Sequence, residues 1–190
     1  SRGLGDVYKR QVYIVLGGGL SPVGGTYAME DADFILHGEA SQDEAGYSAE
    51  HVGDVDADGI PAYLIVARGN DDWSSNQGKA YLVFGKNIVD DDDGVVPLHD
   101  SQFHIAGEHG DQLRGVASGD VDGDGMSDIL VAGGQNDELE TNQGKVYLYT
   151  SSTIFAKPYD IHLESTNNNY RFTGDSGGDL AGDIVAPGGD

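Results

Sequence analysis

The sequence has 190 residues and is strongly acidic, with 33 Asp and Glu against 10 Lys and Arg and a formal net charge of −23. This charge argues against nucleic acid and anionic membrane surfaces as partners, because both are bound through Lys and Arg, and it favours a divalent cation. The absence of cysteine excludes disulfides and thiolate metal sites, and no apolar run reaches the ~18 residues of a membrane span, so we expect no membrane insertion within this sequence.

The first eleven residues, SRGLGDVYKRQ, resemble a translated sequencing adapter. We therefore expect residues 1–11 to be a non-native scar, and such scars are excluded from fold reasoning. The resemblance implies that the sequence is a translated metagenomic sequencing read or contig, and that its true N-terminus is missing. A signal peptide, anchor or further domain outside these residues can then be neither sought nor excluded.

The rest of the chain repeats. The segment that begins GDVDADG at Gly53 returns as GDVDGDG at Gly119, 66 residues later, and the same offset relates Lys79 to Lys145. Repetition at one fixed offset over some thirty residues indicates a repeat architecture. We divide the native part into the tail of a preceding unit (12–31), two repeats (32–98 and 99–166) and an incomplete repeat (167–190).

Short apolar segments follow one another along each unit, bounded by Gly, Asp and Asn. They are Tyr63–Ala67, Lys79–Phe84, Phe103–Ala106, Ile129–Ala132 and Val146–Tyr149. Their length and their β-branched and aromatic residues are typical of strands, and about four strands per unit is what a propeller blade requires. We predict an all-β partial β-propeller, an open arc of two to three four-stranded antiparallel blades with calcium loops between inner strands.

The order Phe-x-x-x-Gly, then Gly-Asp-Val-Asp-Gly-Asp-Gly, then an apolar strand, resembles the FG-GAP repeat of integrin α-subunits and of bacterial surface and secreted proteins. Phe103 and Gly107 carry the first half of the motif, as Phe34 and Gly38 do earlier. The resemblance covers residues 32–190. In those proteins the repeat builds a seven-bladed propeller. For this chain the resemblance implies a propeller, an extracellular or cell-surface location, and Phe103–Ala106 as the outer strand of the blade whose inner strand lies near Tyr47–Val52.

A calcium loop is predicted at Asp120–Asp128. With Asp120 as position 1, carboxylates stand at positions 1, 3, 5 and 9: Asp120, Asp122, Asp124 and Asp128. Gly at position 6 permits a sharp turn that would direct the carbonyl of Met126 to the same point. Such hard oxygen ligands suit Ca²⁺, with Mg²⁺ second, and argue against zinc and copper. The EF-hand alternative fails because position 12 is Val131 and a strand follows.

The other copies of the loop are weaker. Asp54, Asp56 and Asp58 stand at positions 1, 3 and 5, and Ile60 would supply the carbonyl, but position 9 is Ala62, so we expect lower affinity. In the third copy twelve residues are missing, either through a deletion during sequencing or assembly or because Asp175, Asp179 and Asp183 form a degenerate loop.

No catalytic constellation is found. The peptide Gly174–Gly178 resembles a serine-protease nucleophile segment, but no partner motif accompanies it. Trp73 lies on a loop that in integrin-like propellers faces the ligand, so it is a candidate binding anchor; packing against Tyr63 or Pro61 is the alternative. We expect a non-enzymatic, calcium-binding extracellular adhesion module for a protein or glycan. The alternative is an accessory propeller of a larger secreted hydrolase or lyase.

Overall fold

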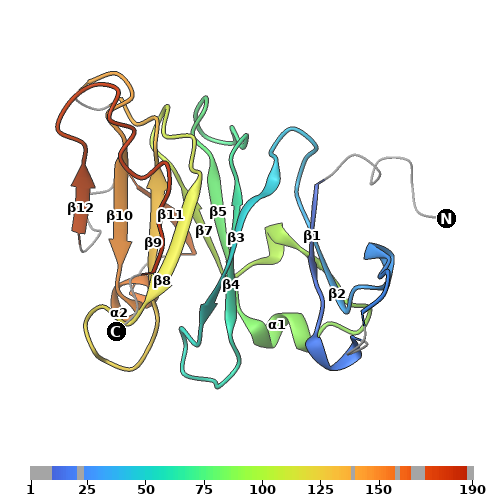
Figure 1. The fold of residues 1–190 in the computed structure, drawn as a ribbon. Helices are drawn as coiled ribbons and strands as arrows, with labels where there is room; N and C mark the ends of the chain where they lie inside the picture. Colours follow the sequence, from blue (N-terminus) through green and yellow to red (C-terminus); the bar gives the residue numbers. More distant parts are fainter. Residues whose placement is uncertain (1–9, 21–23, 138–139, 157–158, 164–169, 188–190) are drawn as a thin grey trace.

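The computed structural model describes residues 10–20, 24–137, 140–156, 159–163 and 170–187. Three sheets stand side by side, each with its strands running along the height of the molecule (Figure 1). The prediction of an all-β partial propeller is confirmed, and we call the sheets the first, second and third blade. Within the described residues no helix is long and apolar enough to cross a membrane.

The first blade has the strand order β1-β2-β6, the second β11-β7-β5-β4-β3 and the third β12-β10-β9-β8. In chain order, the strands are β1 (Gln11–Ile14), β2 (Phe34–His37), β3 (Ala45–Gly53), β4 (Ala62–Ala67), β5 (Lys79–Val83), β6 (Val95–Pro97), β7 (Phe103–Ala106), β8 (Gly115–Gly119), β9 (Asp128–Gly133), β10 (Lys145–Tyr149), β11 (Asp160–His162) and β12 (Tyr170–Thr173). The helices are α1 (Gly85–Val89) and α2 (Ser151–Phe155), with 3-10 turns at Gly17–Gly19, Met29–Asp31 and Leu98–Asp100.

The central strands of the second blade are apolar on both faces because this blade is covered by a neighbouring blade on each side. In β4, Leu64 and Val66 belong to the core shared with the third blade. Their neighbour Ile65 faces the core shared with the first blade. Side chains of a strand alternate between the two faces of a sheet, so a strand buried on both faces reads as a continuous apolar run. The two cores lie between the blades and hold them together.

The predicted offset between sequence repeat and blade is confirmed. The strand Phe103–Ala106 pairs with β5 in the sheet whose inner strand is β3. Residues 32–98 thus supply β2 and β6 to the first blade and β3, β4 and β5 to the second. The repeat boundaries themselves remain a prediction.

Two features differ from the expected four-stranded antiparallel blade. After the third strand of a blade, the chain forms a one-turn helix and then a short strand that pairs in parallel with the outer strand of the preceding blade: β6 with β2, and β11 with β7. The second blade therefore has five strands, and its outer edge is closed by the unit that follows it. The expected scar lies outside the described residues except for Arg10 and Gln11, and Gln11 begins β1.

Candidate metal centre

Two acidic loops join the inner strand of a blade to the next strand, one between β3 and β4 and the other between β8 and β9. Both lie at the same end of the sheets (Figure 1). Each turns at a glycine with positive φ, +84° at Gly59 and +88° at Gly125. Residues with a Cβ rarely adopt this conformation, which explains glycine at the sixth position of both loops.

The later loop brings three carboxylates together. One oxygen from each of Asp120, Asp122 and Asp124 lies within 4.8 Å of the other two. Ca²⁺ lies about 2.3–2.6 Å from its oxygen ligands, so ligands on opposite sides of the ion are about 5 Å apart. The donor set and its spacing therefore fit this cation.

Backbone amides hold these carboxylates in place. Gly125 N–H donates to Asp120 Oδ2 over 2.9 Å, and Met126 N–H donates to Asp124 Oδ1 over 2.8 Å. The hydroxyl of Ser151, at the start of α2, also donates to Asp124 Oδ2 over 3.1 Å. Each carboxylate oxygen has two lone pairs, so these bonds leave acceptor capacity for a cation. The predicted use of the Met126 carbonyl stays a prediction.

Asp128 is not among the three converging carboxylates. It is fully buried, and its two oxygens accept hydrogen bonds from the backbone N–H groups of Val121, at 2.8 Å, and Ser151, at 2.9 Å. Asp128 thus joins the start of the loop to the start of α2. The structure assigns it this supporting contact, and its predicted role as a ligand remains untested.

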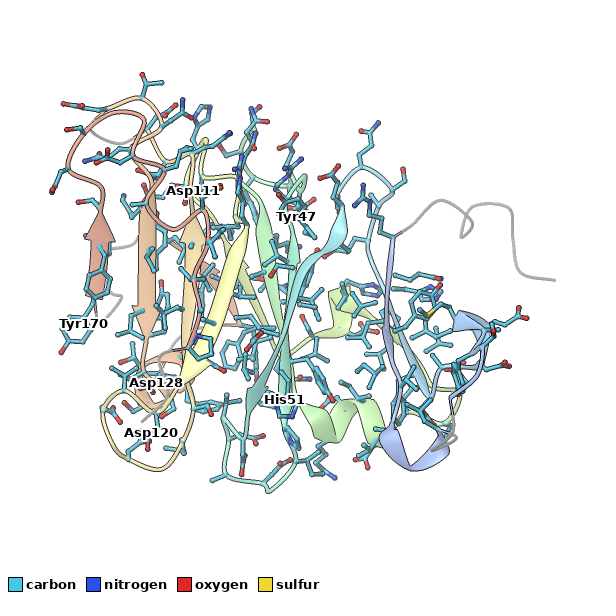
Figure 2. All side chains as sticks on the ribbon, in the orientation of Figure 1. Tyr47, His51, Asp111, Asp120, Asp128 and Tyr170 are labelled. Atoms are coloured by element: carbon cyan, nitrogen blue, oxygen red, sulfur yellow. The ribbon has the colours of Figure 1, made fainter. Side chains whose placement is uncertain are left out.

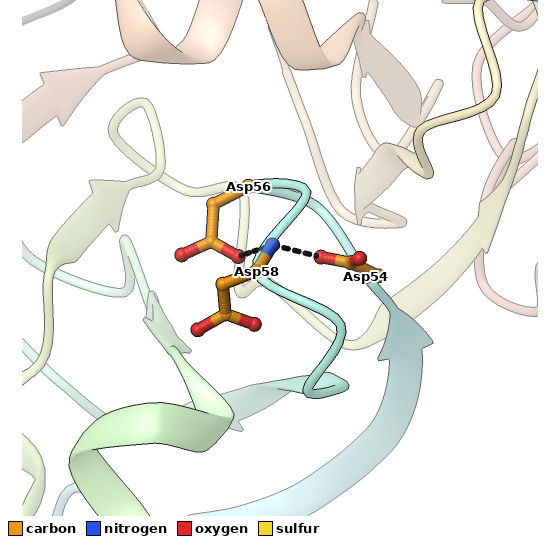
Figure 3. A group of neighbouring side chains, drawn as sticks. All are labelled: Asp54, Asp56 and Asp58. Carbon is orange, nitrogen blue, oxygen red and sulfur yellow. Dashed lines mark hydrogen bonds between the residues drawn. The ribbon is translucent and has the colours of Figure 1, made fainter.

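The earlier loop repeats the arrangement (Figure 3). Oxygens of Asp54, Asp56 and Asp58 again lie within 4.8 Å of one another. Gly59 N–H donates to Asp54 Oδ2 over 2.9 Å and Ile60 N–H to Asp58 Oδ1 over 2.7 Å, the same positions as in the later loop. The carbonyl of Ile60 remains a predicted ligand. Two loops of different sequence have folded into one geometry.

The electrostatics of both loops favour a cation. Desolvation and then the charges of Asp128, Asp124 and Asp120 raise the pKa of Asp122 above its ordinary value. Desolvation and then Asp58 raise the pKa of Asp56 in the same way. A raised carboxyl pKa means that the negative form is disfavoured, and a bound divalent cation would relieve this repulsion.

The two loops also contact each other. Ser127 N–H donates to the backbone oxygen of Asp54 over 3.2 Å. Gly53 has φ +74°, which favours glycine, and a Cβ there would lie 2.5 Å from the hydroxyl of Ser127 and displace it. This contact ties the acidic-loop end of the second blade to that of the third.

The predicted alternative for the third copy is not supported by the geometry. Asp183 forms an ion pair with Arg114, while Asp179 Oδ2 accepts the backbone N–H groups of Asp175 and Ser176. Within the described residues these three aspartates are not among the groups placed to share a metal ion.

Trp73 lies between β4 and β5, at the opposite end of the sheet from the acidic loops. Its side chain is 47% exposed. Its ring meets the edge of His162 at 4.9 Å between centroids, and Lys79 Nζ lies 4.9 Å from the ring centre. Tyr63 instead pairs with His51. The indole therefore packs against His162 and Lys79 and is partly open to solvent, and its role as a binding anchor stays a prediction.

A polar network that the sequence analysis did not assign lies at this same end, away from Asp120 and Asp128 (Figure 2). In it a Lys and a Tyr of one blade, with an Asn, bind two carboxylates that follow the outer strand of the preceding blade; we call it the polar clasp. Its copy between the first and second blades consists of Glu39, Asp43, Asn70, Lys79 and Tyr81. Its copy between the second and third consists of Glu108, Asp111, Asn136, Lys145 and Tyr147.

The clasp contacts are short and largely buried. Lys79 Nζ lies 2.7 Å from Glu39 Oε1, and Lys145 Nζ lies 3.0 Å from Glu108 Oε2. The Tyr147 hydroxyl donates to Asp111 Oδ2 over 3.0 Å. Burial raises the pKa of Asp111 to about 6, against the opposing effect of these hydrogen bonds. One feature of the sequence could have indicated the clasp: a lysine stands in an otherwise apolar strand at the same place in both repeats, Lys79 and Lys145.

Comparison with known families agrees with this geometry. The model of the FG-GAP repeat matches residues 114–149, which include the later acidic loop and three members of the clasp, Asn136, Lys145 and Tyr147. This stretch is an FG-GAP repeat. The FG-GAP repeat is a non-catalytic repeat of β-propellers. A search of curated proteins found no match to the chain.

Proposed function

We propose that this chain is a calcium-stabilised, extracellular propeller module that binds a protein or glycan and has no catalytic role of its own. The observation that carries the proposal is the pair of acidic loops with one shared geometry, placed at the same end of neighbouring blades and joined by the hydrogen bond from Ser127 to Asp54. Bound Ca²⁺ would supply positive charge that holds the carboxylates together. The loops themselves position the oxygens and connect the blades.

The ligand would bind at the other end of the blades. There the partly exposed Trp73 ring packs against Lys79 and His162, and its loop connects the strands β4 and β5. Aromatic side chains on rigidly supported loops are frequent anchors for proteins and sugars. Calcium then has a structural purpose, and the binding surface lies elsewhere.

The test is thermal unfolding with millimolar Ca²⁺ and with EDTA. Extracellular calcium modules have Kd values of about 10⁻⁴–10⁻³ M, so each occupied site adds about 1 kcal/mol, or about 2–4 °C in Tm. We expect Asp124→Asn to reduce this gain, because the later loop loses a charged ligand. Asp92→Asn removes an exposed carboxylate outside both loops and should keep the full gain. An unchanged Tm on chelation contradicts the proposal.

A further inference from the structure

The loop that carries Trp73 is held from both neighbouring blades. Its later half is fixed by backbone hydrogen bonds from the segment that leads into β8 of the third blade. Gly110 N–H donates to the backbone oxygen of Ser75 over 3.3 Å. Gln112 N–H donates to that of Asn76 over 2.8 Å. Both bonds lie on the C-terminal side of Trp73, so the indole itself belongs to the other half of the loop.

The earlier half of the loop is held toward the first blade through Lys79. The ammonium nitrogen of Lys79 lies 2.9 Å from Asp72 Oδ2, on the loop. It also lies 2.7 Å from Glu39 Oε1, which follows the outer strand of the first blade, and 4.9 Å from the centre of the Trp73 ring. The lysine side chain is only 3% exposed. One buried cation thus connects a carboxylate of the first blade to the indole and to the residue before it.

The charge of Lys79 depends on both carboxylates. Burial favours the neutral amine, but hydrogen bonds to Glu39 and Asp72 raise the pKa of Lys79 above its ordinary value. Burial also opposes the ionisation of Asp72, whose pKa is nevertheless lowered by hydrogen bonds from Lys79 and Asn70. Removing one partner of a buried ion pair leaves the other charge uncompensated. Loss of the Glu39 contact would therefore loosen the lysine and, with it, the earlier half of the loop.

We propose that Lys79 is the positioning residue of the Trp73 site and couples this site to the junction between the first and second blades, so that the indole is presented to a ligand only while Glu39 contacts Lys79. The inference rests on the proposed function in taking Trp73 as the ligand anchor. Opening this junction would release the earlier half of the loop, while the later half stays bound to the third blade. Ligand binding would in turn favour the closed junction, because coupling between two sites is reciprocal.

The fluorescence of Trp73 tests the coupling, because the sequence contains a single tryptophan. Acrylamide quenching is measured on the full chain and on its Lys79→Met and Glu39→Ala variants, and circular dichroism checks that the strands are retained. Since Trp73 is 47% exposed, we expect local opening to raise the quenching constant by up to about twofold and to shift the emission to the red in both variants. The double variant should show no larger rise than Lys79→Met alone, as expected of groups in contact.

Two further variants sharpen the test. Lys145→Met removes the counterpart lysine, which pairs with Glu108 at the junction between the second and third blades. This variant should lose stability and keep the Trp73 quenching of the wild type. Glu39→Gln keeps the shape of the side chain and removes its charge, so it should raise quenching less than Glu39→Ala and remain folded if the alanine variant does not.

The decisive outcome concerns Glu39, which lies on the first blade and acts on the ring through Lys79. Quenching that rises in Lys79→Met but in neither Glu39 variant would mean that the lysine acts on the ring locally, and would overturn the coupling. An equal rise in Lys145→Met would indicate general loosening and would overturn it as well. The measurement uses no ligand and is made in EDTA and in Ca²⁺, so its failure is distinct from an unchanged Tm on chelation, which contradicts the proposed function.

Discussion

Asp111 is a buried carboxyl group whose ionisation should govern part of the protein's pH dependence. It is fully buried between the second and third blades, where burial raises its pKa to about 6 from an ordinary value of 3.8. The folded state therefore retains a proton on Asp111 at pH values where the unfolded chain has lost it. The resulting stabilisation is complete below about pH 4 and is lost as the pH rises through about 6.

We expect Asp111→Asn to remove this component. A difference of about two pH units corresponds to a free energy of unfolding on the order of 2–3 kcal/mol, since one unit is about 1.4 kcal/mol. Urea denaturation between pH 4 and 8 in EDTA measures it, and the wild type should lose more stability over this range than the variant. Asp179→Asn changes an exposed aspartate, which follows β12 as Asp111 follows β7, and this variant should show the same pH dependence of stability as the wild type. If the stability of Asp111→Asn changed with pH as that of the wild type does, the proposed contribution of Asp111 would be wrong.

At this scale the sequence predicted the convergence of three aspartates in each acidic loop, and it did not predict the clasp. Asp120, Asp122 and Asp124 stand at alternate positions of one short loop, so their spacing and one glycine determine how they converge. Lys145 meets Glu108 only because the outer strand of one blade lies beside the third strand of the next. That contact depends on blade packing, which local spacing does not encode.

At the scale of elements, β11 is a short edge strand whose central side chain is nevertheless deeply buried. It has three residues, follows a one-turn helix and pairs in parallel with β7. Its central residue, Ile161, is 2% exposed and lies in the core between the second and third blades. A three-residue strand shows no alternation long enough to detect, which is why β6 and β11 were not predicted although β4, β5, β7, β9 and β10 were.

Ile161→Ala should destabilise the protein by about 2–4 kcal/mol, because it opens a cavity in a core that two blades share. Ile161→Val removes a single methylene group and should cost about 0.5–1.5 kcal/mol. Equilibrium denaturation measures both losses of stability. The β7 amides should also exchange faster in Ile161→Ala than in Ile161→Val. Equal stability of wild type and Ile161→Ala would show that β11 adds nothing to the blade edge.

At the scale of the whole molecule, the second blade belongs to both cores. Leu64 faces the third blade, while Ile65 faces the first. Losing either interface exposes a face of the same sheet, so the three blades should unfold together. This expectation follows from the shared blade and does not depend on calcium.

Ile65→Ala tests the coupling. The change lies in the core between the first and second blades, and we expect it to lower the midpoint of one calorimetric transition by several degrees, with about 2–4 kcal/mol lost. The calorimetric and van't Hoff enthalpies should agree, as they do for two-state unfolding. A separate early transition of the first blade would show that the cores are independent.

The parallel strands β6 and β11 bear on how such a protein can grow. Each 66-residue unit completes the edge of the blade before it and leaves its own edge to be completed by its successor. A tandem gene duplication cut at any point of the repeat therefore restores every junction, since whatever one copy lacks the next provides. The array can be lengthened by any segment that is a whole number of repeats. An insertion or deletion of another length disrupts two neighbouring blades at once.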